Sequence, residues 1–204
     1  MKVGIIDYGA GNLRSVANAV RGTGVEPVIL PDPERLDDIT HLILPGVGSF
    51  GDCMSELAAR KLTEPIRTWL AADKPYLGIC LGYQVLFESS EETPGTAGLG
   101  ALPGNVRRFQ QSPGLKIPHM GWNSALPVTP DQGVWQGLGA EPYFYFVHSY
   151  FPAPADDDLV AARTSYGLDD FASAVSRGRL TATQFHPEKS QDAGIRLLRN
   201  FLGL

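Results

Sequence analysis

Cysteine is scarce in this sequence, and long hydrophobic runs are absent. The 204 residues include only Cys53 and Cys80, so a disulfide framework is excluded, and no Cys/His cluster has the spacing of a zinc site. The longest apolar stretch, Tyr76 to Phe87, is too short to cross a bilayer. Asp7 follows Met1 too closely for a signal peptide. We therefore expect a soluble cytoplasmic protein without a metal.

Positive charge is also in short supply. The chain has 17 Lys and Arg against 22 Asp and Glu, a net charge of −5, which argues against general electrostatic binding to nucleic acid. Glycine and proline, by contrast, are plentiful at 23 and 16 residues, and 43% of the chain is hydrophobic, as is typical of a compact α/β enzyme with many specific turns. Because no repeat or low-complexity tract interrupts the sequence, we expect a single domain over residues 1–204.

The first ninety residues alternate between short apolar runs and helical patterns. The predicted strands are Val3-Ile6, Pro27-Leu30, His41-Leu44 and Tyr76-Ile79, and the helices begin at Leu13, at Asp52 and at Leu81, the last ending at Ser89. Asn12 is expected to cap the first helix. This alternation predicts a mostly parallel, doubly wound α/β sheet with helices on both faces.

The second half of the chain has a different pattern. From about Leu99 it contains short β-like segments, followed by a closing helix from Gln191. The segments are Asn105-Phe109, Tyr143-Tyr150, Leu159-Thr164, Phe171-Ser176 and Leu180-Phe185. We expect them to form an antiparallel extension of the same sheet, and we interpret Lys116-Asn123 as an unusual loop.

Cys80 is a candidate nucleophile because of where it lies, in Gly78-Ile79-Cys80-Leu81-Gly82. A strand that turns abruptly into a helix pushes the side chain between them out of the sheet edge, and the flanking glycines remove Cβ atoms that would clash there. The helix N-terminus adds free N–H groups and positive potential, which favour a thiolate. The alternative is an inert, buried cysteine.

Two glycine-rich turns also follow predicted strands, at the edge where open α/β sheets bind ligands. Asp7-Asn12 only faintly resembles a phosphate loop, because it lacks G-x-G-x-x-G. Pro45-Asp52 lies after the third strand and is either half of an oxyanion hole or an ordinary turn capped by Asp52. The Leu81 N–H would point at the same oxyanion.

A cysteine nucleophile needs a base within hydrogen-bond reach, and the base needs an acceptor that orients it. His186 follows a predicted strand and opens His186-Pro187-Glu188, in which the rigid proline holds a carboxylate two positions away. The other histidines, which we interpret as structural or leave without a role, are His41, His119 and His148. Cys80, His186 and Glu188 are therefore a candidate nucleophile, base and orienter, the alternative being a capping histidine and a surface glutamate.

Together these motifs resemble a known family. Gly78-Ile79-Cys80-Leu81-Gly82-Tyr83-Gln84 and Gln184-Phe185-His186-Pro187-Glu188 are similar to the class I, or triad, glutamine amidotransferases. Within that family, the sequence most resembles the branch whose members are subunits of imidazole glycerol phosphate synthases. The segments that carry it are Ile6-Asn12, Leu44-Gly51, Ile117-Asn123, Val147-Tyr150 and His186-Ser190. They extend over essentially the whole chain.

The resemblance implies hydrolysis of glutamine to glutamate and ammonia through a thioester on Cys80, without a cofactor. Ammonia would pass through a channel to a cyclase subunit of the (β/α)₈-barrel type, in a 1:1 heterodimer that makes imidazole glycerol phosphate and an aminoimidazole carboxamide ribotide from a phosphoribulosyl precursor. In this family the loop at Pro45-Gly48 can hold the Val47 N–H away from the oxyanion until the partner binds its own substrate.

The resemblance also assigns roles to individual residues. The oxyanion donors would be Val47 and Leu81. The glutamine site would include Gly46, Gly48, Gln84, Glu92, Ser149 and Tyr150, and the partner interface Asn12, Trp122, Tyr145 and Lys189.

Two other functions stay open on the sequence. One is another triad glutaminase, either the type that feeds pyridoxal phosphate synthesis or a free-standing hydrolase; the segments Asp7-Asn12 and Lys116-Asn123 argue against it. The other is an inactive amidotransferase-like scaffold that only binds and regulates a partner. The presence of all three candidate triad residues argues against a scaffold.

Overall fold

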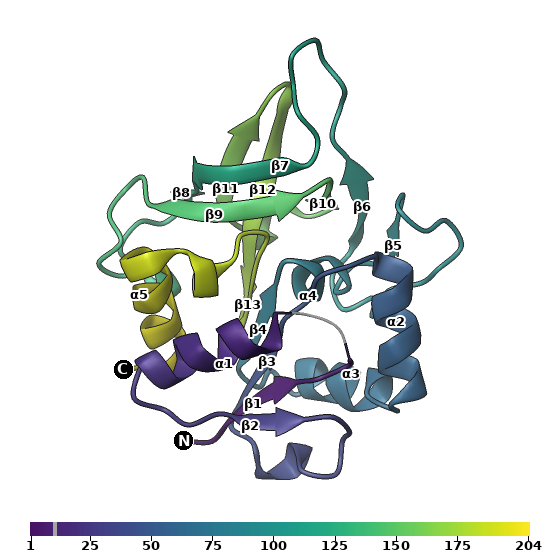
Figure 1. The fold of residues 1–204 in the computed structure, drawn as a ribbon, viewed down its shortest axis with the longest axis vertical. Coiled ribbons are helices and arrows are strands. Elements are labelled where there is room, and N and C mark those ends of the chain that lie inside the picture. The colour runs from purple at the N-terminus through teal and green to yellow at the C-terminus, as the bar shows by residue number, and fades with distance from the viewer. Residues whose placement is uncertain (10–11) are drawn as a thin grey trace.

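The computed structural model describes residues 1–9 and 12–204 (Figure 1). Ala10 and Gly11, in the turn after the first strand, lie outside the described residues. The helices are α1 Leu13–Gly22, α2 Phe50–Ala59, α3 Thr63–Ala71, α4 Leu81–Gln84 and α5 Gln191–Leu202. The strands are β1 Val3–Ile6, β2 Val28–Leu30, β3 His41–Leu44, β4 Tyr76–Ile79, β5 Ser89–Ser90, β6 Gly104–Arg108, β7 His119–Ser124, β8 Leu126–Pro127, β9 Tyr143–His148, β10 Tyr150–Pro154, β11 Val160–Tyr166, β12 Asp169–Arg177 and β13 Leu180–Thr183.

An eight-stranded sheet in the order β2-β1-β3-β4-β13-β12-β11-β8 organises the fold. The strands from β2 to β13 in this order run parallel, and β12, β11 and β8 continue the sheet antiparallel. The predicted fold class is thus confirmed. The late strand β13 pairs with β4, with Ala182 opposite Gly78 and Thr183 opposite Ile79. This pairing brings the residues that follow β13 beside those that follow β4.

Helices cover both faces of the parallel part of the sheet (Figure 1). Alternate side chains along each strand point to opposite faces, and β3 illustrates this. Ile43 packs with α1 and α5, whereas Leu42 and Leu44 pack with α2, α3 and α4. A third, aromatic core under β9 includes Phe144, Phe146, Phe171 and Phe185.

Several segments of the second half lie outside the main sheet, contrary to the prediction of one continuous extension. β6 pairs with β5 and β10 in a three-stranded sheet, and β7 pairs with β9 in a two-stranded one. The predicted strand at residues 143–150 is divided at Ser149, because β9 pairs with β7 while β10 pairs with β6. Most of the predicted loop at residues 116–123 is strand β7, whose backbone groups pair with β9.

The helix after Cys80 is shorter than predicted. It ends at Gln84 rather than Ser89 because a later segment satisfies the carbonyl groups of the residues that follow. Leu99 N–H donates to Val85 O at 2.7 Å, and Ala101 N–H donates to Leu86 O at 2.9 Å. Those carbonyls are then unavailable to a further helical turn.

Two predicted helix caps also differ. Asn12 precedes α1, but its side chain donates to Glu188 Oε1 at 3.4 Å instead of capping the helix. The cap of α2 is Ser49, whose Oγ accepts from Asp52 N–H at 3.2 Å, so the helix begins at Phe50 rather than Asp52. Within the described part of the chain, none of the helices is long and apolar enough to span a bilayer.

Candidate active site

Cys80 occupies a sharp turn between β4 and α4. Its φ of 53° and ψ of −103° lie outside the usual regions for a residue with a Cβ atom. Cys80 N–H donates to Thr183 O at 2.7 Å, which ties the turn to β13. A Cβ on Gly82 would lie 1.9 Å from Leu44 O, and one on Gly78 would lie 2.6 Å from Gly82 O. Both glycines are therefore needed for the turn to pack.

His186 and Glu188 form a buried pair beside this turn. His186 Nδ1 lies 2.8 Å from Glu188 Oε1, and the two side chains are 2% and 1% exposed. Because a carboxylate only accepts, Nδ1 carries the proton in this contact. Pro187 begins the short 3₁₀ turn Pro187–Lys189 that holds the carboxylate two positions after the imidazole.

The charge state of His186 depends on Cys80. Burial lowers the pKa of His186, but the charge of the Cys80 thiolate, followed by Glu188, outweighs burial and raises the pKa to about 10. The imidazole is therefore protonated at neutral pH when the sulfur is anionic. His186 Nε2 is buried and has no hydrogen-bond partner among the described residues.

Cys53, the second cysteine, has a different environment. It is 1% exposed, lies in the core beside α3, and belongs to no disulfide. Burial raises the pKa of its thiol to about 12. Cys53 is therefore a protonated core residue rather than a second nucleophile.

The loop after β3 lies against the start of α4. Leu81 N–H, one predicted oxyanion donor, makes a long hydrogen bond of 3.5 Å to Gly46 O. A Cβ on Gly46 would lie 2.6 Å from Leu81 Cβ and 2.8 Å from the Tyr8 hydroxyl, so only glycine fits there. Gly48 has a φ of +105°, another conformation suited to glycine. In this arrangement the Leu81 N–H, the predicted oxyanion donor, is hydrogen-bonded to the Gly46 carbonyl.

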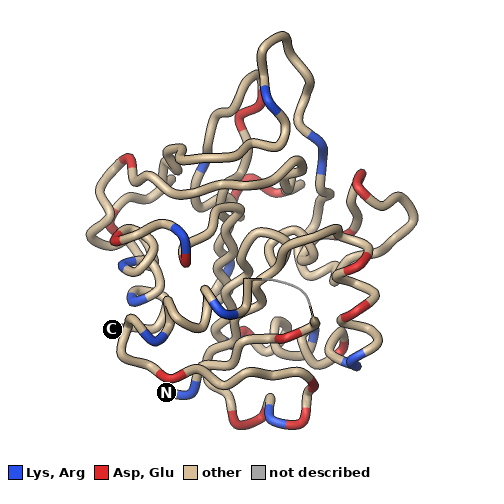
Figure 2. Tube along the Cα trace, viewed as in Figure 1, with Lys and Arg blue, Asp and Glu red and all other residues tan. Residues whose placement is uncertain are grey.

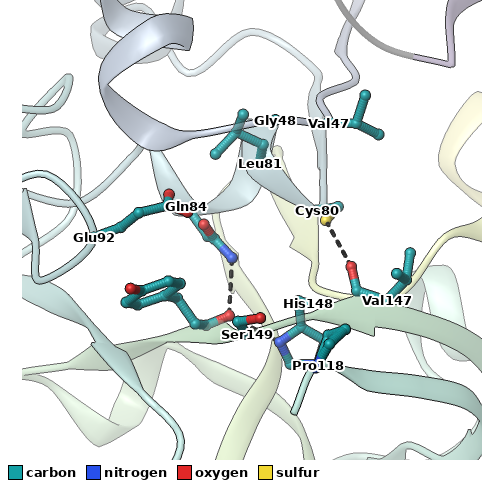
Figure 3. Close-up of a pocket in the computed structure, with 11 residues that line it drawn as sticks. Val47, Gly48, Cys80, Leu81, Gln84, Glu92, Pro118, Val147, His148 and Ser149 are labelled. Atoms are coloured by element: carbon teal, nitrogen blue, oxygen red, sulfur yellow. Dashed lines mark hydrogen bonds between the residues drawn. The ribbon is translucent and has the colours of Figure 1, made fainter.

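A pocket of about 300 Å³ opens over Cys80 (Figure 3). Of the residues assigned to the oxyanion hole and the glutamine site, those that line it are Val47, Gly48, Leu81, Gln84, Glu92, Ser149 and Tyr150. Gly46 is not among the lining residues. Pro118, Val147 and His148, which were not predicted as site residues, also line the pocket. They lie there because β7 pairs with β9, and no local sequence pattern reveals that pairing.

Two polar side chains that line this pocket are fixed by hydrogen bonds with backbone groups. Glu92 Oε2 accepts from Phe50 N–H at 2.7 Å, so its carboxylate lies at the N-terminus of α2. Gln84 Nε2 donates to Tyr150 O at 2.9 Å, as the dashed line in Figure 3 marks. The pocket thus presents a carboxylate at one end and the Cys80 sulfur at the other.

The residues assigned to the partner interface lie close to the triad. Trp122 and Tyr145 face each other across the β7–β9 pair, with ring centroids 6.3 Å apart. Lys189 Nζ lies over the Tyr145 ring at 5.6 Å. Asn12 contacts Glu188 directly. The described residues contain no group of three or more metal-ligating side chains.

Comparisons with known proteins agree on the family. The family model described as Glutamine amidotransferase class-I matches residues 4–203. "Imidazole glycerol phosphate synthase subunit HisH" of Synechococcus elongatus is 47% identical over 201 residues, covering 98% of this chain and 92% of the relative. The protein of the same name from Rhodopirellula baltica is 50% identical over 197 residues, covering 97% and 95%.

Solved structures show the same fold. A crystal structure of a glutamine amidotransferase matches with a TM-score of 0.77 at 21% identity, covering 100% of both chains. A chain in the structure of PurLQS from Thermotoga maritima matches with a TM-score of 0.78 at 23% identity, covering 99% of this chain and 97% of that one. The family model and the sequence matches show that the chain belongs to the class I glutamine amidotransferases and, within them, to the HisH subunits of imidazole glycerol phosphate synthase.

Proposed function

We propose that this chain is the glutaminase subunit of an imidazole glycerol phosphate synthase in histidine biosynthesis, with its catalytic machinery in a single domain over residues 1–204. It hydrolyses glutamine to glutamate and ammonia and passes the ammonia to a cyclase subunit. The observation that carries the proposal is the buried His186–Glu188 pair beside Cys80, which lies at the floor of a pocket. Both cysteines are free thiols, as is typical of proteins in a reducing compartment, which supports a cytoplasmic location.

The first half of the reaction forms a thioester. The Cys80 thiolate attacks the side-chain amide carbon of glutamine, and the tetrahedral intermediate collapses as the C–N bond breaks. The protonated His186, whose pKa is raised to about 10 by Cys80 and Glu188 against the effect of burial, donates its proton to the departing ammonia.

The second half regenerates the thiolate. Neutral His186 takes a proton from water, whose oxygen attacks the acyl carbon. The C–S bond then breaks, its electron pair returns to sulfur, and glutamate leaves. Throughout, Glu188 holds the imidazole through Nδ1, so that Nε2 faces the reacting atoms.

Substrate orientation follows from the two ends of the pocket. Glu92 would receive the α-amino group of glutamine, since Phe50 N–H holds Oε2 and no other described residue donates to the second carboxylate oxygen. Gln84, Ser149, Tyr150 and Gly48 would enclose the rest of the substrate. Gly46 would act indirectly, through the contact of its carbonyl with Leu81.

The oxyanion hole would be regulated through that contact. Leu81 N–H and Val47 N–H are the proposed donors, and the Leu81 donor is engaged by Gly46 O. Loss of one oxyanion donor typically costs about 10²–10³ in rate. We infer that movement of the Pro45–Gly48 loop, driven by a loaded partner, frees the donor and raises the rate of hydrolysis.

The surface for this partner would lie on the outward face of the β7–β9 pair. Trp122 is 47% exposed, Met120 62% and Tyr143 54%, and neither strand carries a charged residue (Figure 2). Exposed aromatic side chains grouped in this way are typical of protein interfaces. Asn12, Tyr145 and Lys189 border the same face and link it to the triad. We propose a 1:1 heterodimer with a (β/α)₈-barrel cyclase.

The test is glutamate release by the purified chain, alone and with the cyclase subunit loaded with its nucleotide substrate. We expect a large increase with the loaded partner and none with a Cys80→Ala variant. Equal, rapid release in both conditions would instead indicate a free-standing hydrolase. No release in either condition would favour an inactive scaffold.

A further inference from the structure

The Cys80 sulfur has two contacts that the proposed mechanism does not use, one with the Val147 carbonyl at 3.9 Å (Figure 3) and one with Gln184. Gln184 follows β13 directly and is fully buried, two residues before His186. Its side-chain Nε2 lies 3.5 Å from Cys80 Sγ. Gln184 does not line the pocket, so this contact is not a by-product of enclosing the substrate.

The neighbours of Gln184 determine which end of its amide faces the sulfur. Gln84 contacts two groups, the Tyr150 carbonyl at 2.9 Å and the Gln184 side chain at 3.1 Å. A carbonyl only accepts, so the Gln84 atom at Tyr150 must be the NH₂ group. The same NH₂ group donates to Gln184, so that side chain presents its oxygen to Gln84. The NH₂ group of Gln184 therefore points at Cys80. The hydrogen-bond partners fix this orientation of the amide.

A pair of buried histidines holds the Tyr150 carbonyl in place. His148 Nδ1 lies 2.8 Å from Tyr150 O and must donate. His148 Nε2 lies 3.1 Å from His119 Nδ1, and His119 Nε2 lies 3.3 Å from Asn123 Nδ2. Burial lowers the pKa of His119 to about 4 and that of His148 to about 3. Both rings are thus neutral, each with one donor and one acceptor, and every link in this chain is satisfied.

We propose that Gln184 is a further catalytic residue, whose side-chain N–H donates to the Cys80 thiolate while Gln84 holds the amide in that orientation. The inference rests on the proposed function of Cys80 as nucleophile. A hydrogen bond to a charged acceptor is stronger than one to a neutral acceptor, so this donor favours the anionic sulfur. It acts twice in the cycle: before attack, and again when the C–S bond of the thioester breaks and the electron pair returns to sulfur.

The test measures the reactivity of the sulfur itself, in the full-length chain at pH 7. Iodoacetamide alkylates a thiolate far faster than a thiol, and peptide mapping by mass spectrometry distinguishes Cys80 from the buried Cys53. We expect Gln184→Glu and Gln184→Met to lower the alkylation rate of Cys80 about tenfold. Ser173→Ala is the matched control, since Ser173 is equally buried and its carbonyl accepts from Gln184 N–H. That variant should react at the wild-type rate.

The Gln184→Met variant decides between a chemical and a structural role. It is uncharged and keeps the length of the side chain but lacks the N–H donor, whereas Gln184→Glu also places a carboxylate beside the sulfur. Alkylation at the wild-type rate in a folded Gln184→Met variant would overturn the proposal. If both Gln184 variants fail to fold in thermal melts, Gln84→Met takes their place, because it removes the group that orients the amide. A severalfold loss of reactivity is then expected, and no loss overturns the proposal.

Alkylation requires neither glutamine nor the cyclase subunit. A wild-type chain that releases no glutamate with its loaded partner would refute the proposed function. The alkylation rates of the variants would still report on Gln184 in that case. Failure of the proposed function and failure of the Gln184 proposal are therefore distinguishable.

Discussion

At the scale of single residues, the site depends on a charge that the protein holds out of water. The histidine pair at residues 119 and 148 is neutral, whereas His186, which is also buried, is positive when the Cys80 sulfur is anionic. The difference lies in the neighbours, since only His186 has the Cys80 sulfur on one side and a carboxylate on the other. An imidazolium in this position is ready to act as an acid before glutamine is attacked.

Glu188→Gln tests this arrangement. We expect the pKa of His186 to fall from about 10, because the carboxylate contributes both a hydrogen bond and a charge. NMR titration of the imidazole C–H signals measures that change. Glutamate release with the loaded partner should fall about 10²–10⁴-fold, the range expected when acid–base catalysis is lost. A pKa of His186 that stays near 10 would show that Cys80 alone sets it.

The same substitution should alter stability in a defined pH window. The folded pKa of His186, about 10, lies above the value of about 6.5 expected in the unfolded chain. The stabilisation is therefore fully present below pH 6.5 or so and is lost as pH rises through about 10. Urea denaturation should show wild type more stable than Glu188→Gln near pH 6, by about 1.5–3 kcal/mol. The difference should shrink as pH approaches 10, whereas a constant difference would contradict the linkage.

At the scale of elements, the turn between β4 and α4 is the most constrained feature of the fold. A strand, a strained residue and a helix start meet within six residues, and the β3 backbone lies against them. The closest approach is between Gly82 and the carbonyl of Leu44. Backbone atoms cannot move aside as the end of a flexible side chain can, so this approach leaves no room for a methyl group.

Gly82→Ala should therefore be costly. The new Cβ would meet Leu44 O at 1.9 Å and Leu44 C at 2.8 Å, and we expect a loss of about 3 kcal/mol in the free energy of unfolding. Gly22→Ala is the control. Gly22 ends α1, and its Cβ would meet only Ile195 Cδ1 at 3.8 Å, so alanine there should be neutral or stabilise by up to about 1 kcal/mol. Equal urea midpoints for the two variants would contradict the close-packing argument.

Elements with strong local signals could be predicted from the sequence. The bounds of β1, β3 and β4 are those predicted, because these strands are short apolar runs that are buried except at His41, and α5 begins at Gln191 as expected. Helix α3 was missed, because Pro65 lies within its first turn and masks the apolar spacing of Ile66, Trp69 and Leu70. Strand β7 was interpreted as a loop, since Gly121 and Asn123 weaken its alternation and its strand character comes from pairing with β9.

Only part of the candidate site could be predicted from the sequence, for a related reason. Cys80, His186 and Glu188 stand next to strands that the pattern reveals. Gln184, by contrast, looks like any polar residue at a strand end, and its contact with Cys80 exists only because β13 pairs with β4. Pairing between strands a hundred residues apart carries no local signature.

At the scale of the whole molecule, the β7–β9 pair adjoins the candidate catalytic residues, since His186 N–H donates to Tyr145 O at 2.9 Å. Trp122 and Tyr145 are on its outward face, and Lys189 connects Tyr145 to the turn that carries Glu188. A partner bound there would touch residues one or two positions from the triad. Association and catalysis can therefore influence each other without a long path through the core.

Trp122→Ala tests the surface. The side chain is 47% exposed in the described chain, so the melting temperature should change little. Binding to the cyclase subunit should weaken by about 2 kcal/mol or more, roughly 30-fold in Kd, as for a central aromatic side chain in an interface. Leu204→Ala is the control, because Leu204 is 48% exposed at the C-terminus, away from the β7–β9 pair (Figure 1). Titration calorimetry measures both, and equal affinities would place the interface elsewhere.

Coupling between the two subunits must also be reciprocal, because it is a difference in binding free energy that both ligands share. A Cys80→Ser variant, which keeps the polar group at the pocket floor but hydrolyses glutamine poorly, allows binding to be measured without turnover. If a loaded cyclase raises its affinity for glutamine, saturating glutamine must raise the affinity of the cyclase for its own ligand by the same factor. We expect a factor of about 5–150, corresponding to 1–3 kcal/mol, from calorimetric titrations in both orders.

An affinity for glutamine that is independent of the partner, together with a large increase in glutamate release by the wild-type pair, would mean that the partner acts on the reaction rate alone. The movement of the Gly46 carbonyl from Leu81 N–H would then stabilise the oxyanion without altering the bound substrate.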